Sequence, residues 1–266
     1  MRVGMLGCGR IARAFAEGWR RPDLTGEQRP DLAFYDLLPE RARELAAVAG
    51  GYAARTAAEL VHCSDFVIMA VKPPDVPQVL GAIGTALDGT PLVSLAAGVP
   101  LPAVAAALPP EAHVGRAMPN VAVSVGHGVI LFDAGSLGEF ESLVREVLGL
   151  LGQVITMPRS LWDEGTAISG CGPAFVALFT EALEEAALAV GLEPRLARSL
   201  ALGTAAGTGI LMAHKDDAAG VRDIVATPGG MTTPGVEILE ARGLREAVKL
   251  AVQAAVAKAK ELAWAP

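Results

Sequence analysis

A glycine-rich turn near the first residue constrains the fold of this chain more than any other feature. A short apolar run, Val3–Leu6, leads into the hexapeptide Gly7-Cys8-Gly9-Arg10-Ile11-Ala12, and helical periodicity follows as far as Trp19. Where a strand, a G-x-G-x-x-A turn and a helix follow one another, the first glycine permits the tight turn and the second lets a ligand approach the backbone. The helix N-terminus then presents N–H groups to an anion. The segment predicts a dinucleotide bound at residues 7–12.

Short β-rich runs alternate with Ala/Leu-rich helical stretches as far as residue 158. This alternation predicts an α/β Rossmann domain over residues 1–158, with a doubly wound, mostly parallel sheet. We expect Val129–Phe132, which follows the turn Gly126-His127-Gly128, to be antiparallel and to lie at the far edge of the sheet. The expected strands are Val3–Leu6, Leu32–Tyr35, Phe66–Val71, Leu92–Leu95, His113–Ala117 and Val129–Phe132, and the expected helices are Ile11–Trp19, Pro39–Val48, Val76–Leu87 and Leu101–Leu108.

After Pro158 the strand patterns stop, and Ala/Leu-rich helices predict an all-α domain over residues 159–266. Gly191 stands where a helix C-terminus favours a left-handed residue, and Pro194 stands where the next helix begins. Ser199–Ala213 is apolar nearly all the way round, which predicts burial on every side. In so small a domain, a partner subunit is the simplest cover. The expected helices are Leu161–Val190, Pro194–Met212, Gly235–Ala241 and Leu244–Trp264.

Composition excludes several classes of function. The 22 basic and 29 acidic residues give a net charge of −7, which argues against nucleic acid or anionic lipid as a partner. The longest uncharged runs, such as Ser199–Ala213, contain Gly and Thr, so no membrane span is expected. The chain begins with a strand rather than a signal sequence, which predicts a cytoplasmic protein. Its cysteines, Cys8, Cys63 and Cys171, are widely spaced, which predicts reduced thiols and no metal site.

Asp36 follows the second expected strand, where a carboxylate accepts the ribose 2′-hydroxyl of NAD and repels the 2′-phosphate of NADP. Taken alone, this residue favours NADH. Arg41 and Arg43 follow on the next helix, within reach of a phosphate. The alternative role for Asp36 is that of a surface cap for the helix beginning near Pro39. The choice between NADH and NADPH stays open.

Three further loops follow expected strands. They are Ala70-Val71-Lys72-Pro73, the small pair Ala97-Gly98, and the segment that ends at Asn120. Because the carboxyl ends of parallel strands share one edge, where open α/β sheets bind ligands, we expect these loops to line the cofactor cleft. Each loop taken singly is also consistent with ordinary strand termination by Pro or Gly.

In the helical half, residues 226–235 form a polar segment rich in glycine and stiffened by two prolines. Successive N–H groups at a Gly-Gly turn before a helix form an anion site, and threonine hydroxyls add uncharged donors. The segment therefore predicts a site for a small carboxylate; the alternative is an ordinary turn with an N-capping threonine. The candidate substrate-binding residues are Thr227, Gly229, Gly230, Met231 and Thr232.

Taken together, these motifs make the chain similar to the pyrroline-5-carboxylate reductase family along essentially its whole length. The similarity rests on residues 7–12, 70–73, 116–120 (Arg-Ala-Met-Pro-Asn), 169–175 (Ser-Gly-Cys-Gly-Pro-Ala-Phe) and 227–233 (Thr-Pro-Gly-Gly-Met-Thr-Thr). The last of these is the most specific to the family. The resemblance implies a Rossmann domain followed by a helical dimerisation domain, with assembly as homodimers and as larger rings of dimers such as a decamer.

The resemblance also implies a reaction. The substrate would be a small molecule with a carboxylate and a cyclic imine, 1-pyrroline-5-carboxylate, reduced to L-proline in the last step of proline biosynthesis. NADPH is the usual reductant, and some members accept NADH. By resemblance the substrate carboxylate binds at Thr227–Thr232, and Thr232 is the catalytic hydroxyl near the imine nitrogen. The chain departs from the commoner pattern at Cys171 and Thr227, where Ser is usual, and at Phe175, where Tyr is usual.

Two other functions stay open. A β-hydroxyacid dehydrogenase has a similar arrangement, but such enzymes use a lysine on the long helix as a general base, and Gly172–Val190 contains none. Imine reduction needs orientation more than a strong base. A non-catalytic regulator that binds a dinucleotide is the other alternative. Retention of both the glycine-rich turn and Thr232 favours catalysis.

Overall fold

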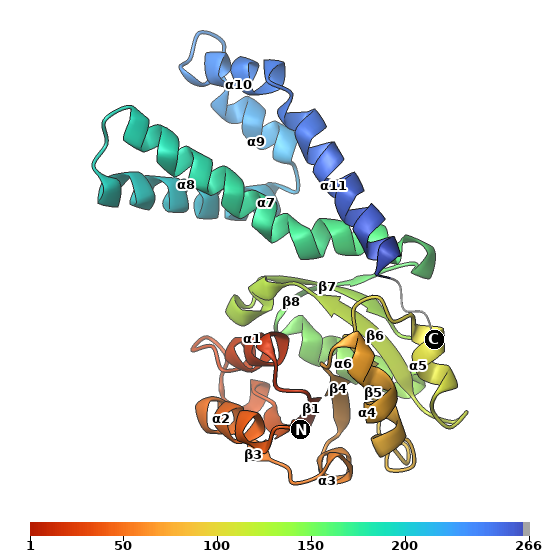
Figure 1. Cartoon of the computed structure of the whole chain (residues 1–266). Coiled ribbons are helices and arrows are strands. Elements are labelled where there is room, and N and C mark those ends of the chain that lie inside the picture. Colours follow the sequence, from red (N-terminus) through yellow and green to blue (C-terminus); the bar gives the residue numbers. More distant parts are fainter. Residues whose placement is uncertain (263–266) are drawn as a thin grey trace. The chain divides into compact units, whose positions relative to one another are not determined.

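The first part of the chain forms an eight-stranded sheet with the order β3-β2-β1-β4-β5-β6-β7-β8 in the computed structural model, which describes residues 1–262 (Figure 1). Only the pairing of β6 with β7 is antiparallel. The strands are β1 (Arg2–Leu6), β2 (Asp31–Tyr35), β3 (Tyr52–Ala53), β4 (Phe66–Met69), β5 (Leu92–Ser94), β6 (Val114–Pro119), β7 (Gly128–Asp133) and β8 (Gly152–Thr156).

Both faces of this sheet are covered by helices. Along β4, Phe66 and Ile68 enter one apolar cluster while Val67 and Met69 enter the other, because successive side chains of a strand point to opposite faces. All four are buried, which is why the strand is a continuous apolar run. The first cluster includes α1 (Arg10–Trp19), α2 (Pro39–Ala49) and α6 (Glu141–Gly149), and the second includes α3 (Ala57–His62), α4 (Val76–Ile83) and α5 (Leu101–Ala106).

The six expected strands are confirmed, and β7 is antiparallel as expected. The expectation that β7 lies at the edge of the sheet is wrong, because β8 pairs with it on the far side. The strands β3 and β8 were not predicted: β3 has two residues, and β8 contains one adjacent apolar pair, Val154-Ile155. The helices α3, α6 and α9 (Ala218–Val225) were also not predicted.

The later part of the chain is helical, as expected. Gly191 has a φ of +93°, and the bonds from its N–H to the Leu188 carbonyl (2.9 Å) and from Leu192 N–H to the Ala187 carbonyl (3.1 Å) end the preceding helix in a Schellman motif. Pro194 opens the next helix. These helices are α7 (Trp162–Ala189), α8 (Pro194–Lys215), α9, α10 (Thr232–Ala241) and α11 (Leu244–Glu261), and residues 263 and 264 of the expected last helix lie outside the described residues. Short 3-10 turns occur at Gly26–Gln28, Pro73–Asp75, Val121–Val125, Gly138–Phe140 and Arg159–Leu161.

The chain forms two compact units. One comprises Met1–Gly170 together with the chain from Val256 onward, and the other comprises Cys171–Ala255. Both α7 and α11 therefore contribute residues to each unit. The helical segment begins at Arg159, but the second unit begins twelve residues further on, at Cys171. A functional division between residues 158 and 159 stays a prediction.

The expectation that Ser199–Ala213 is buried on every side is wrong for the single chain. Leu200, Leu202 and Ile210 are 49%, 55% and 70% exposed. Arg159–Ala189 and Pro194–Lys215 have the length and composition of membrane spans. Core helices of proteins outside membranes pass the same test, and the absence of a membrane partner stays a prediction.

Two helical glycines allow a test of the packing. A Cβ on Gly18 in α1 would overlap the Val123 carbonyl oxygen and lie 2.6 Å from Leu151 Cδ2, whereas a Cβ on Gly81 in α4 meets no described atom within 4 Å. We expect Gly18→Ala to lower the free energy of unfolding by about 2 kcal/mol through overpacking. Gly81→Ala should raise it by about 0.5–1 kcal/mol, since alanine favours a helix. Urea unfolding at equal protein concentrations measures both, and equal effects would contradict the described contacts of α1.

Candidate cofactor and substrate site

The site at the sheet begins where the strand order reverses. The chain runs outward from β1 through β2 and β3 on one side, then returns to β4 on the other, which makes the carboxyl ends of β1 and β4 a topological switch point. Gly7 N–H donates to the Tyr35 carbonyl (2.8 Å), and Ala70 N–H donates to the Leu6 carbonyl (2.7 Å). These bonds hold the ends of β1, β2 and β4 side by side.

The glycine-rich turn has the shape that a pyrophosphate requires. Gly7 has a φ of +91°, and a Cβ there would lie 2.8 Å from the Ala70 carbonyl oxygen, so residue 7 must be glycine. A Cβ on Gly9 would meet no described atom within 4 Å, which leaves open space above the second glycine. Gly9 is the N-cap of α1, and no side chain caps this end. The first N–H groups of α1 therefore fit an anion.

Asp36 accepts two backbone hydrogen bonds, one of which joins it to this turn. Its Oδ2 accepts from Cys8 N–H (2.8 Å), and its Oδ1 accepts from Leu38 N–H (3.0 Å). Burial raises the pKa of the Cys8 thiol to about 12; the charge of Asp36 acts in the same direction and that of Arg41 opposes it. The thiol is therefore protonated at neutral pH, and Cys8 contributes to the turn through its backbone rather than as a nucleophile.

The other predicted loops lie at the same edge. Ala70 is half-buried at the end of β4, Lys72 is exposed, and Pro73 begins a 3-10 turn. Leu95 N–H donates to the Met69 carbonyl (2.9 Å), which aligns the end of β5 with β4 and leads to Ala97 and Gly98. Ala97 is exposed. The structure thus brings together the predicted residues that follow β1, β2, β4 and β5.

Asn120, which follows β6, is only 8% exposed. Its Nδ2 donates to the Ser169 carbonyl oxygen in α7 (3.0 Å), and its Oδ1 accepts from the N–H groups of Ala122 and Val129 (3.2 Å each). Both polar atoms of this side chain therefore bond to protein groups.

In the other compact unit, the loop between α9 and α10 comprises Ala226–Met231 of the predicted polar segment 226–235. The rest of that segment belongs to α10, which begins three residues before the expected Gly235. Gly230 N–H donates to the Thr227 carbonyl (2.9 Å) and Gly229 has a φ of +76°, as in a type II turn with Pro228 in its usual place. Thr233 Oγ1 also donates to the Thr227 carbonyl (2.9 Å). The hydroxyls of Thr227 and Thr232 have no hydrogen-bond partner among residues 1–262, and Thr232 is the first residue of α10.

Known protein families match both parts of the chain. Residues 159–262 match the family model described as pyrroline-5-carboxylate reductase dimerisation, and residues 2–98 match the one described as NADP oxidoreductase coenzyme F420-dependent. A pyrroline-5-carboxylate reductase of Mycobacterium leprae is 35% identical over 98% of this chain and 96% of its own length. The pyrroline-5-carboxylate reductase 3 of Bos taurus is 35% identical over all of this chain and 86% of its own length. The chain belongs to the pyrroline-5-carboxylate reductase family.

Solved structures of this family have the same fold. The pyrroline-5-carboxylate reductase of Coxiella burnetii superimposes with a TM-score of 0.88 at 28% identity, covering 99% of this chain and 98% of that one. The Plasmodium falciparum pyrroline carboxylate reductase with NADP bound gives a TM-score of 0.84 at 26% identity, with the same coverage. A 3-hydroxyisobutyrate dehydrogenase of Mycobacterium tuberculosis, at 17% identity and a TM-score of 0.51 over 72% of this chain, shares the fold alone.

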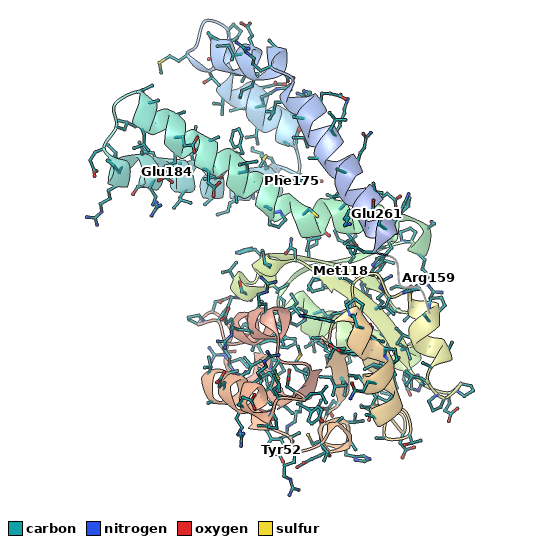
Figure 2. The ribbon with its side chains drawn as sticks, in the orientation of Figure 1. Tyr52, Met118, Arg159, Phe175, Glu184 and Glu261 are labelled. Carbon is teal, nitrogen blue, oxygen red and sulfur yellow. The ribbon has the colours of Figure 1, made fainter. Side chains whose placement is uncertain are left out.

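Two residues of the family motifs, Arg116 and Phe175, received no individual role in the sequence analysis. Arg116 on β6 is 8% exposed, and its guanidinium lies 4.3 Å from the centre of the Trp162 ring. Burial lowers its pKa to about 10, against the opposing charges of Asp163 and Asp133. The sequence signal that could have identified Arg116 is a charged residue within an otherwise apolar strand. Phe175, where the family usually has Tyr, is half-buried on α7 (Figure 2).

Proposed function

We propose that this chain reduces 1-pyrroline-5-carboxylate to L-proline with NADPH or NADH, the last step of proline biosynthesis. The observation that carries the proposal is the match to pyrroline-5-carboxylate reductases along the whole chain, at 35% identity. The glycine-rich turn and the polar loop before α10 are both intact. When bound, the nicotinamide supplies the hydride. The protein has to bind, orient and exclude water from the reactants, and it has to place a proton donor near the imine nitrogen.

We propose that the cofactor binds at the edge that contains the glycine-rich turn. The N–H groups at the start of α1 face the pyrophosphate, with the open space above Gly9 as its cradle. Asp36 accepts the ribose hydroxyls, and the small residues Ala97 and Gly98 let the nicotinamide ring approach the backbone. The proposed cofactor-binding residues are Gly7, Cys8, Gly9, Arg10, Ile11, Ala12, Asp36, Ala70, Val71, Lys72, Pro73, Ala97 and Gly98.

The substrate carboxylate is proposed to bind at the loop between α9 and α10. The type II turn exposes Gly229, and the N-terminus of α10 has no side-chain cap, so backbone N–H groups are available to a carboxylate. The hydroxyls of Thr227 and Thr232 are the uncharged donors, and Thr232 is the proposed donor to the imine nitrogen. The proposed substrate-binding residues are Thr227, Gly229, Gly230, Met231 and Thr232.

We further propose that residues 159–266 act as the substrate-binding and dimerisation domain of a cytoplasmic homodimer, and that dimers assemble into a decamer. The match of residues 159–262 to a dimerisation family supports association. The exposed apolar side chains of α7 and α8 support a protein partner, because a patch of this kind costs free energy in water.

An absorbance assay at 340 nm tests the function. Purified protein should oxidise NADPH or NADH when 1-pyrroline-5-carboxylate is added, and the two cofactors can be ranked in separate reactions. A β-hydroxyacid with the oxidised cofactors serves as the control. Turnover of the control alone would favour the dehydrogenase alternative, and cofactor binding without turnover of either substrate would favour a regulator.

Thr232→Ala should lower kcat by about tenfold to a hundredfold, because one transition-state hydrogen bond contributes roughly 1.5–3 kcal/mol. The Kd of NADPH should change by less than about twofold, since a residue that acts on the imine need not hold the dinucleotide. Thr232→Ser, which keeps the hydroxyl, is the matched control and should retain most of the activity. Unchanged turnover in the alanine variant would rule out the proposed donor.

Asp36→Ser should shift preference from NADH toward NADPH by about tenfold or more in the ratio of kcat/KM values, because it removes both the ribose acceptor and the repulsion of the 2′-phosphate. Asp36→Asn separates charge from shape: it removes the repulsion while keeping one acceptor for Cys8 N–H. If NADH loses no ground in either variant, Asp36 does not contact the ribose.

A further inference from the structure

The hydrogen-bond ladder of α7 is interrupted at one position. Pro173 lies inside this helix and has no N–H, so it cannot donate to the carbonyl of Ser169 four residues earlier, and its ring crowds that carbonyl. The preceding turns are tied within the helix, since Thr166 Oγ1 donates to the Trp162 carbonyl (2.8 Å) and Ser169 Oγ to the Gly165 carbonyl (3.0 Å). Within α7, the Ser169 carbonyl therefore lacks its usual donor.

Asn120 supplies that donor from outside the helix. Its Nδ2 lies 3.0 Å from the Ser169 carbonyl oxygen, although 49 residues separate the two in sequence. Its Oδ1 is held on the opposite side by Ala122 N–H and Val129 N–H, which fixes the orientation of the amide. Asn120 and Ser169 are 8% and 9% exposed, so water has little access to the carbonyl. Without Nδ2, a buried acceptor would be left unpaired, which destabilises the folded state.

We propose that Asn120 is a positioning residue, which replaces the helix hydrogen bond removed by Pro173 and so fixes α7 at the carboxyl end of β6. Ser169 is the last residue but one of α7 within the first compact unit, so the bond holds the helix where it leaves that unit. Met118 lies at the carboxyl end of β6 (Figure 2), and Asn120 follows that strand directly. The sequence placed Asn120 among the cofactor contacts, whereas its hydrogen bonds assign it to the support of α7. The kinetic consequence rests on the proposed function; the bond itself does not.

A double-mutant cycle tests this assignment. Asn120→Asp keeps the acceptor for Ala122 and Val129 but loses the donor to Ser169. Pro173→Ala gives α7 an N–H that can donate to the same carbonyl, which makes Asn120 dispensable. Asn120→Asp alone should lower Tm by several degrees and kcat by about tenfold, because misplaced active-site elements lose orientation. In the Pro173→Ala background the same change should cost less than about threefold in kcat and correspondingly less in Tm.

Two controls separate positioning from other roles. Pro194→Ala changes another helix proline, at a first-turn position where no helix donor is missing, and should not rescue Asn120→Asp. Titration of NADPH fluorescence measures cofactor binding, which should change by less than about twofold in all variants. A weakened cofactor affinity that Pro173→Ala does not restore would overturn the proposal in favour of direct contact. Equal losses of kcat and Tm on Asn120→Asp in the parent chain and in the Pro173→Ala variant, including failure to fold in both, would overturn it as well.

The two proposals fail in different ways. If the parent protein shows no imine reduction, the proposed function fails while the Tm cycle still measures the coupling between Asn120 and Pro173. If the parent is active but the Tm changes are additive, the reductase assignment stands and the positioning role falls.

Discussion

The parallel pairing of β1 between β2 and β4 is the constraint on which the rest of the cofactor edge depends. Parallel strands need crossover helices, so each strand ends at the same edge and each returns through a helix on one face. The turn after β1 is then enclosed by its neighbours: Gly7 has the Tyr35 carbonyl on one side and the Ala70 carbonyl on the other. That confinement excludes a side chain at residue 7, and it aims the N-terminus of α1 at the switch point. The geometry of an anion site thus follows from strand order.

The sequence predicted those parts of the fold that local patterns encode. Strands buried on both faces, such as β4, are continuous apolar runs and were identified, as was the helix boundary at Gly191 and Pro194. The strand β8 was not, because its pairing with β7 contributes more than its own short pattern shows. Its omission produced the error about the sheet edge. For a contact distant in sequence, such as that of Arg116 with Trp162, a local pattern can mark one residue but does not identify its partner.

The exposed apolar helices show why composition alone does not determine what covers the helical part of the chain. A helix that is apolar all round must be covered, and the sequence supports that inference without stating what covers it. In the single chain Leu202 and Ile210 are exposed, so intramolecular packing is not the cover. Length and hydropathy by themselves also allow lipid as the cover, but core helices of proteins outside membranes pass the same test. The match of residues 159–262 to a dimerisation family favours a protein surface, and residue pattern alone could not have made this distinction.

Asp36 and Asn120 look equivalent in sequence, since each is a polar residue just after a strand at the cofactor edge, yet hydrogen-bond capacity separates them. A carboxylate has about four acceptor sites, and Asp36 uses two of them, one on each oxygen, for Cys8 and Leu38. Acceptor sites are left for ribose hydroxyls, so holding the turn and binding the cofactor are compatible. The carbonyl of an asparagine side chain has two lone pairs, and those of Asn120 both accept from backbone N–H groups, while one of the two N–H groups of its amide nitrogen donates to the Ser169 carbonyl. Asp36 therefore keeps free acceptor sites for a ligand, whereas Asn120 keeps a single amide N–H and uses its other hydrogen-bonding capacity on the protein.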